Sequence, residues 1–156
     1  MFSTWQQFSP PSPEVETRID DILTKLTLEE KIDLLGGHPE RGCTRGNQQA
    51  GIPELRMSDG PVGVHWWTKR STTYPASICT AASWDRDLAL KLGAAIGRDA
   101  RARGIHILLA PGVNIYRSPL CGRNFEYLGE DPCLAGQMVS AYIRGVQGMG
   151  VAATVK

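Results

Sequence analysis

Polar residues that could bind or transform a ligand follow three separate apolar stretches of the chain. Asp59 follows LRMS and precedes a Gly-Pro turn, Arg117 and Arg123 lie in the polar segment after IHILLAP, and Lys156 follows VAATV. A carboxylate in such a position can accept hydrogen bonds from two hydroxyls of a ligand, or act as an acid, a base or a nucleophile. An arginine can hold a neighbouring carboxylate while it donates to a ligand oxygen. These four residues are therefore the first candidates for a functional site.

Each candidate also has a purely structural interpretation. Asp59 could bond only the backbone of its own turn, and Lys156 could be the solvated end of a strand. The two arginines could pair with Glu126 and Glu130 and keep their loop folded. The sequence by itself leaves these alternatives open.

Other polar clusters do not point to a metal or a cofactor. The acidic residues Glu126, Glu130 and Asp131 have no accompanying histidine, and Asp131 is better used as a helix cap. The letters around Gly148 and Gly150 match a dinucleotide fingerprint, but they follow a helix and enter a strand, which reverses the required order. We therefore expect no metal site and no cofactor.

Aromatic and sulfur-containing side chains give weaker signals. Trp66 and Trp67 follow the Asp59 turn, where an aromatic face could stack on the apolar face of a sugar, but core packing of both is the simpler interpretation. The cysteines form neither a CxxC pair nor a zinc pattern, and we expect free, mostly buried thiols at Cys43, Cys79, Cys121 and Cys133.

Helix caps and apolar periodicity mark the elements that must position these residues. Ser12 and Pro13 begin a first helix. Its apolar residues share one face: Val15, Ile19, Ile22, Leu23 and Leu26. Thr27 and Glu30 form the capping box of a second helix that stops at glycines 36 and 37. Residues 36–53 predict a long surface loop, and residues 72–84 are ambiguous between strand and loop.

The remainder of the chain alternates strands and helices. Asp85 caps a helix over residues 86–103 that Gly104 closes. The residues expected to face inward are Leu88, Leu92, Ala95, Ile96 and Ala100. Asp131 begins the next helix, which runs to residues 148–150. The order of strand, helix, strand, helix, strand predicts a parallel α/β fold, with a site beyond the carboxyl ends of the strands.

Composition excludes several classes of protein. The chain has 156 residues, 42% of them hydrophobic and 21% charged, and a formal net charge of +1. No global field attracts nucleic acid or an anionic membrane, and no apolar run is long enough to span a bilayer. No signal peptide is visible at the N-terminus, which favours a cytoplasmic location without establishing it.

Three motifs together resemble the N-terminal domain of family 3 glycoside hydrolases, a group that includes many β-glucosidases. They are MSDGPVGV at 57–64, APGVNIYRSPLCGRNFEYLGEDP at 110–132 and GVAATVK at 150–156. The resemblance implies a (β/α)8 TIM-type barrel, of which the chain would hold the first strands and helices. Residues 1–13 would form an extended arm and residues 14–156 the N-terminal part of the barrel domain.

The resemblance also implies roles for individual residues. Asp59, Arg123 and Lys156 match residues that bind the terminal sugar of a β-linked glucoside, while Arg117, Glu126 and His65 would support them. Position 65 is His where the family often has Arg, so that contact would be weaker, pH-dependent or absent. The nucleophilic aspartate and the acid/base glutamate of the family match no residue here.

The resulting hypothesis is that the full-length protein releases terminal non-reducing β-D-glucose from β-glucosides with retention, using no cofactor. This chain would supply part of the sugar subsite, and we expect it to be inactive alone. The alternative is a non-catalytic carbohydrate-binding α/β protein. Linkage and aglycone specificity, export and oligomeric state do not follow from the sequence.

Overall fold

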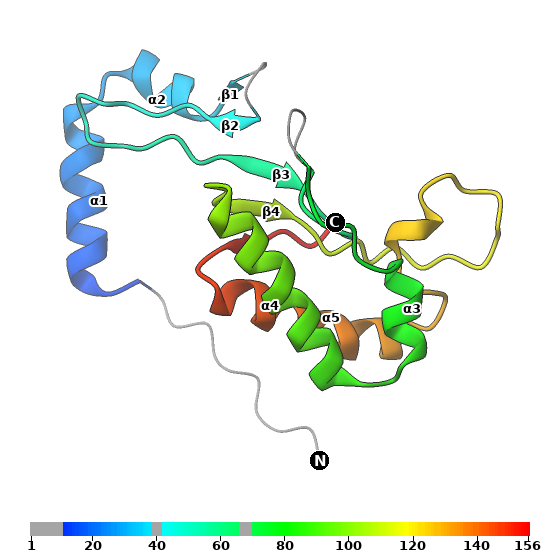
Figure 1. Ribbon diagram of the computed structural model, residues 1–156. Helices are drawn as coiled ribbons and strands as arrows, with labels where there is room; N and C mark the ends of the chain where they lie inside the picture. The colour runs from blue at the N-terminus through cyan, green and yellow to red at the C-terminus, as the bar shows by residue number, and fades with distance from the viewer. Residues whose placement is uncertain (1–10, 39–41, 66–69) are drawn as a thin grey trace.

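A three-stranded parallel sheet with helices packed against it forms the centre of the molecule (Figure 1). The computed structural model describes residues 11–38, 42–65 and 70–156. The sheet has the order β3 (Met57–Asp59), β4 (Ile107–Leu109) and β5 (Ala152–Ala153). Parallel pairing sets Met57 beside Ile107, and Ile107 beside Ala152. The predicted alternation of strands and helices is therefore confirmed.

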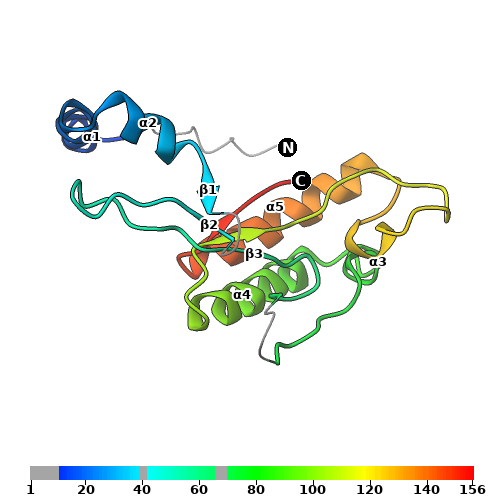
Figure 2. The same cartoon turned by 90° about the horizontal axis from the view of Figure 1, so that it is seen from above.

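Two long helices make the crossovers between these strands. Helix α4 (Arg86–Ala102) joins β3 to β4 and α5 (Pro132–Gly148) joins β4 to β5, and the two lie side by side (Figure 2). The predicted caps are present, because Asp85 accepts from the backbone N–H groups of Asp87 and Leu88. Asp131 does the same for the first turn of α5. Gly104 follows α4 with a φ of 69°, a conformation that favours glycine.

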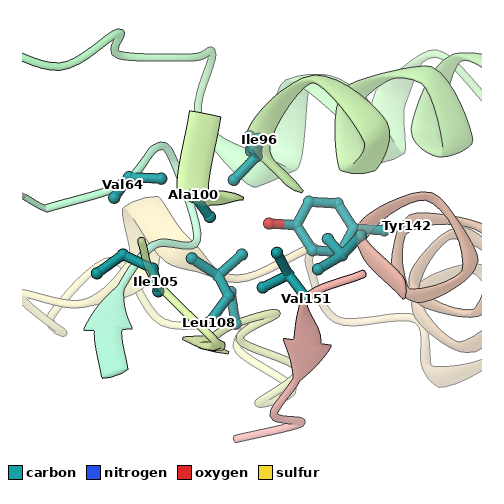
Figure 3. Packing of buried hydrophobic residues seen from close by; sticks show 9 residues of the cluster. Val64, Ile96, Ala100, Ile105, Leu108, Tyr142 and Val151 are labelled. Atoms are coloured by element: carbon teal, nitrogen blue, oxygen red, sulfur yellow. The ribbon is translucent and has the colours of Figure 1, made fainter. Parts of the chain in front are cut away.

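The main core lies between the strands and these helices (Figure 3). Leu108 of β4 and Ile96 of α4 are fully buried there, together with Val146 of α5. Glycines bring the helices unusually close: a Cβ at Gly93 would overlap the Tyr142 carbonyl, and a Cβ at Gly145 would overlap that of Leu90. Apart from Ile96, the buried residues of α4 are therefore small: Ala89, Gly93, Gly97 and Ala100.

The N-terminal helices are formed as predicted but do not join that core. Helix α1 spans Pro13–Lys25 after the Ser12 cap, and α2 spans Leu28–Leu34 with the complete capping box of Thr27 and Glu30. No residue of α1 is buried, and Val15, Ile19 and Leu23 remain 41–47% exposed. Figure 1 shows α1 at the margin of the molecule, away from α4 and α5. Most of the arm expected over residues 1–13 lies outside the described residues.

Three segments contain more regular structure than the sequence predicted. Part of the loop expected over residues 36–53 is a short antiparallel pair, β1 (Gly37–His38) and β2 (Cys43–Thr44). The ambiguous segment contains a short helix, α3 (Ser77–Ala82), which has no side-chain cap. In the loop after β4, a 3₁₀ turn, η1 (Asn124–Glu126), interrupts the irregular chain.

Some burial predictions were wrong. Leu88 is 45% exposed, and its neighbour Ala89 is fully buried instead, because α4 meets α5 through small side chains. All four cysteines are free as expected, but only Cys43 is buried. None of the helices in the described ranges is long and apolar enough to cross a membrane.

Candidate functional site

The three parallel strands carry the predicted residues to the same edge of the sheet. Asp59 is the last residue of β3, Arg123 lies in the segment after β4, and Lys156 follows β5. All three line one open hollow of about 540 Å³, together with Glu126 and His65. A site at the carboxyl ends of parallel strands is the arrangement expected for an α/β fold.

The turn after β3 holds Asp59 at the rim of this hollow. The backbone N–H of His65 donates to the carbonyl of Asp59 at 2.9 Å, and the buried Ser58 hydroxyl donates to the carbonyl of His65 at 2.8 Å. A Cβ at Gly60 would overlap the side chain of Leu108, so the turn rests directly on the central strand. The Asp59 side chain itself is 59% exposed. The turn is thus fixed by its contact with the central strand, while the Asp59 carboxylate faces solvent.

A buried tyrosine supports the same turn from the helix layer. The Tyr142 hydroxyl donates to the carbonyl of Gly60 at 3.5 Å. Burial raises the pKa of Tyr142, with the nearby Tyr74 phenol adding to the effect, so the hydroxyl keeps its proton. Helix α5 therefore contributes to the position of Asp59 without reaching the hollow.

Backbone pairing fixes Lys156 next to the segment that follows β4. Its N–H donates to the carbonyl of Pro111 at 3.1 Å, and its carbonyl accepts from the N–H of Val113 at 2.8 Å. The Lys156 side chain is 26% exposed. Its backbone position is consequently set by pairing with the segment that follows β4.

Four side chains of alternating charge form a continuous set, which we call the charged quartet: Asp59, Lys156, Glu126 and Arg123. The Lys156 Nζ lies 3.5 Å from Asp59 Oδ1 and 3.2 Å from Glu126 Oε2. The other carboxylate oxygen of Glu126 accepts from Arg123 Nε. Two cations and two anions therefore balance within the hollow.

The two carboxylates of the quartet have different environments. The Glu126 side chain is only 4% exposed, whereas Asp59 faces solvent. Burial raises the pKa of the Glu126 carboxyl, but hydrogen bonds from Arg123 and Lys156 outweigh burial, and the net pKa lies below its ordinary value. The hydrogen bond to Glu126 also raises the pKa of Arg123. Glu126 is thus a buried, ionised acceptor.

The other sequence candidates are placed less centrally. His65 lines the hollow and is exposed, whereas Arg117 is exposed and is not among the lining residues. Trp66 and Trp67 lie outside the described residues. The pairing that the sequence left open for Arg123 and Glu126 is present, and Arg123 lines the hollow as well.

Sequence reasoning missed several lining residues. Phe125 is 53% exposed and lines the hollow between the two sequence neighbours Arg123 and Glu126. The hydroxyl residues Ser71, Thr72 and Thr73 line it from the segment before α3. Phe125 had a signal, its place within the charged motif, but residues 71–73 follow no strand or helix that would have marked them.

The donors and acceptors of the hollow suit a polar, uncharged ligand. Within the part of the chain that the structure describes, no group of three or more His, Cys, Asp or Glu side chains could hold a metal ion. Asp59 offers an exposed acceptor, and Arg123 and Lys156 offer donors at the same rim. Paired donors and acceptors of this kind can bind hydroxyl groups.

Sequence comparisons match most of the chain to one family. A model of the glycosyl hydrolase family 3 N-terminal domain matches residues 39–156. A β-glucosidase of Bacteroides ovatus is 52% identical over 157 residues, which cover 91% of this chain and 20% of that protein. A thermostable β-glucosidase of Acetivibrio thermocellus is 41% identical, covering 88% of this chain and 20% of the relative. The chain therefore spans about a fifth of the length of these curated relatives.

Solved structures lead to the same family. A β-glucosidase from Thermotoga neapolitana in complex with glucose superposes with a TM-score of 0.81 and 38% identity, covering 89% of this chain and 22% of that one. A β-glucosidase from Kluyveromyces marxianus in complex with glucose superposes with a TM-score of 0.83 and 38% identity, covering 88% and 17%.

Proposed function

Because the chain belongs to glycosyl hydrolase family 3, as part of its N-terminal domain, we propose that the whole protein releases terminal β-D-glucose from β-glucosides with retention of configuration. The observation that carries this proposal is the convergence of Asp59, Arg123 and Lys156 on one hollow at the strand ends. The glucose complexes of similar structures support glucose as the sugar.

In this proposal the chain binds the non-reducing sugar. The Asp59 carboxylate accepts hydrogen bonds from two neighbouring hydroxyls, and Arg123 and Lys156 donate to hydroxyl oxygens. His65 lines the same hollow and adds a contact at its margin. Arg117, which is exposed, has at most a supporting role through its loop. Residues 14–156 together form the sugar-binding part of the domain.

The reacting carboxyl groups are supplied by other parts of the whole protein. A retaining glycosidase needs a nucleophile and a proton donor about 5–5.5 Å apart. Glu126 is unsuited to either task, because it is buried and ionised and both of its oxygens already contact cations. Asp59 is not available as a reacting group either, because in this proposal its carboxylate accepts hydrogen bonds from the sugar hydroxyls. We therefore expect the 156-residue chain alone to show no turnover.

We also propose that the three strands belong to a (β/α)8 barrel. Sequential parallel strands joined by long helices are the repeating unit of that fold, and its active sites lie at the carboxyl ends of the strands. The order β3-β4-β5 with α4 and α5 as crossovers supports this arrangement.

Binding and turnover measurements test the proposed function. The protein expressed from its full reading frame should hydrolyse an aryl β-glucoside and bind glucose in a calorimetric titration. Asp59→Asn should weaken glucose binding about tenfold or more, since a hydrogen bond to a charged group contributes about 1.5–3 kcal/mol and about 1.4 kcal/mol corresponds to a factor of ten.

A matched control makes the result specific. Asp20→Asn removes an exposed carboxylate on α1, far from the hollow, and should leave glucose affinity unchanged. Glucose affinity that is the same in Asp59→Asn and in the wild type would contradict the proposed binding role. Turnover by the 156-residue chain alone that disappears in Asp59→Ala would contradict the assignment of the reacting carboxyl groups to the rest of the protein.

A further inference from the structure

Glu126 has an environment that differs from the loop around it. Most of the segment from Asn114 to Arg123 is exposed, yet the Glu126 side chain is 4% exposed. The turn η1 produces this burial, because the N–H of Glu126 donates to the carbonyl of Arg123 at 3.1 Å. The following residues, Tyr127 and Leu128, are buried as well and anchor the turn.

Each oxygen of this carboxylate contacts a different cation. Oε1 accepts from Arg123 Nε, and Oε2 lies 3.2 Å from the Lys156 Nζ. The two cations come from different parts of the chain, because Arg123 directly precedes η1 and Lys156 follows β5. Glu126 therefore links the loop after β4 to the segment that follows β5.

Arg123 and Lys156 keep N–H donors that their contacts with Glu126 do not use. A guanidinium has five N–H donors, of which the one on Nε contacts Glu126, so the four on the terminal nitrogens can face the hollow. An ammonium has three, and Lys156 directs them toward Glu126 and Asp59 with one to spare. The contact with Glu126 thus holds Arg123 through Nε, leaving its terminal nitrogens for a ligand, and it holds the Lys156 Nζ while leaving that ammonium a further N–H.

The charges of the quartet also indicate that Glu126 affects how the other members meet a ligand. The carboxylate is the buried member of these ion pairs, since the side chains of Lys156 and Arg123 are 26% and 60% exposed, and its removal takes one negative charge from the quartet. Without Glu126, Lys156 would have Asp59 as its neighbouring anion in the quartet, and Arg123 would lose the acceptor that orients its guanidinium. Asp59 would then share its carboxylate with Lys156 more fully and offer less to a ligand.

We propose that Glu126 is a positioning residue, which holds Arg123 and Lys156 in the orientation that binds the sugar without touching the sugar itself. This inference rests on the proposed function, since the sugar is the ligand for which the cations are held.

A double-mutant cycle on the whole protein tests it. Glu126→Gln keeps the size of the side chain but removes its charge, and it should raise the Kd for glucose about tenfold or more, because small displacements of binding groups are costly. When Arg123 is already replaced by alanine, Glu126→Gln should raise the Kd for glucose by a clearly smaller factor, because part of its effect acts through that arginine. Glu130→Gln removes an exposed carboxylate from the same loop and should leave glucose affinity unchanged.

A conservative variant and ligand-free crystal structures distinguish the possible outcomes of this experiment. If Glu126→Gln does not fold, Glu126→Asp, which keeps the charge one methylene shorter, should weaken glucose binding less than tenfold but measurably. In crystals without ligand, Arg123 and Lys156 should leave their wild-type positions in the Glu126 variant. Unchanged positions, or equal costs of Glu126→Gln in both backgrounds, overturn the inference. A wild-type protein that binds no glucose contradicts the proposed function instead, and the ligand-free crystals still decide the role of Glu126.

Discussion

At the scale of single residues, the hollow shows how two carboxylates acquire different properties from their surroundings. Asp59 ends a strand and is 59% exposed, so it can exchange water for a ligand. Glu126 is 4% exposed and has a cation at each oxygen. Residue type alone does not distinguish them, but burial and partners do.

The lowered pKa of Glu126 predicts a specific loss of stability in acid. A carboxyl group whose pKa is lower in the folded state stabilises the fold above its unfolded pKa, near 4.5, and this contribution is lost as the pH falls through the folded pKa. As the pH falls below about 4.5, the free energy of unfolding of the wild type should therefore decrease more steeply than that of Glu126→Gln.

Urea denaturation at several pH values measures this difference. Glu130→Gln should retain the wild-type slope, because it removes an exposed carboxylate that lies outside the quartet. Parallel curves for the wild type and Glu126→Gln over the acid range would show that the ion pairs of Glu126 do not contribute to stability.

At the scale of elements, the close contact of α4 and α5 depends on glycine. A Cβ at Gly93 would overlap the backbone carbonyl of Tyr142, which cannot move without shifting α5. Gly93→Ala should therefore destabilise the protein by about 1–3 kcal/mol, the usual cost of overpacking. The measurement is the free energy of unfolding in urea.

Gly136 provides the matched control on α5, since a Cβ there would have nothing within 4 Å. Gly136→Ala should stabilise the protein by up to about 1 kcal/mol, because alanine is the better helix former. If the two alanine variants had equal stability, steric contact between the helices would not explain the glycine at position 93.

Helix capping gives a second prediction at this scale. Asp131 accepts from the N–H groups of Cys133 and Leu134 at the start of α5. Asp131→Ala should lower the free energy of unfolding by about 0.5–2 kcal/mol, while Asp131→Asn, which can still accept, should lose less. Thermal unfolding followed by circular dichroism compares the variants, and an alanine variant as stable as the wild type would argue against the cap.

Elements with strong local signals were predictable from the sequence. The caps at Asp85 and Asp131, the capping box at Thr27 and the strand ends at Asp59 and Lys156 all depend on residues close together in the chain. For the same reason Asp59, Arg123 and Lys156 could be placed at the ends of the strands, whereas their assignment to sugar binding came from the family resemblance and is a proposal.

Elements stabilised by distant contacts were not predictable. Helix α3 has six residues and no side-chain cap, and it is held by burial of Thr80 and Ala81. The pair β1–β2 has two residues in each strand, which is too short for a periodic pattern. The ion pair between Glu126 and Lys156 likewise joins two residues that are distant in the sequence.

At the scale of the whole molecule, the described chain has a packed body and a loosely packed N-terminal part. Ile96 of α4 is fully buried, whereas Ile19 of α1 is 41% exposed. Ile96→Ala should destabilise the 156-residue chain by about 2–5 kcal/mol. Ile19→Ala should change its stability by no more than about 0.5 kcal/mol, as is usual for surface positions.

Chemical denaturation of both variants checks this contrast. A large cost at Ile19 would mean that α1 packs on a surface that contributes to the stability of the body. A small cost at Ile96 would contradict the core assigned to the sheet and its two helices.

The parallel register of β3, β4 and β5 has a consequence for how the site can be assembled. Asp59 precedes α4, whereas the other three members of the quartet follow β4, so the hollow forms only after both crossovers are complete. A chain divided at the turn of Gly104 would give one fragment that contains Asp59 and a second fragment that contains Arg123, Glu126 and Lys156. If glucose binds as proposed, it should bind only when the two fragments have reassociated. Glucose binding would then measure fragment complementation without any need for catalysis.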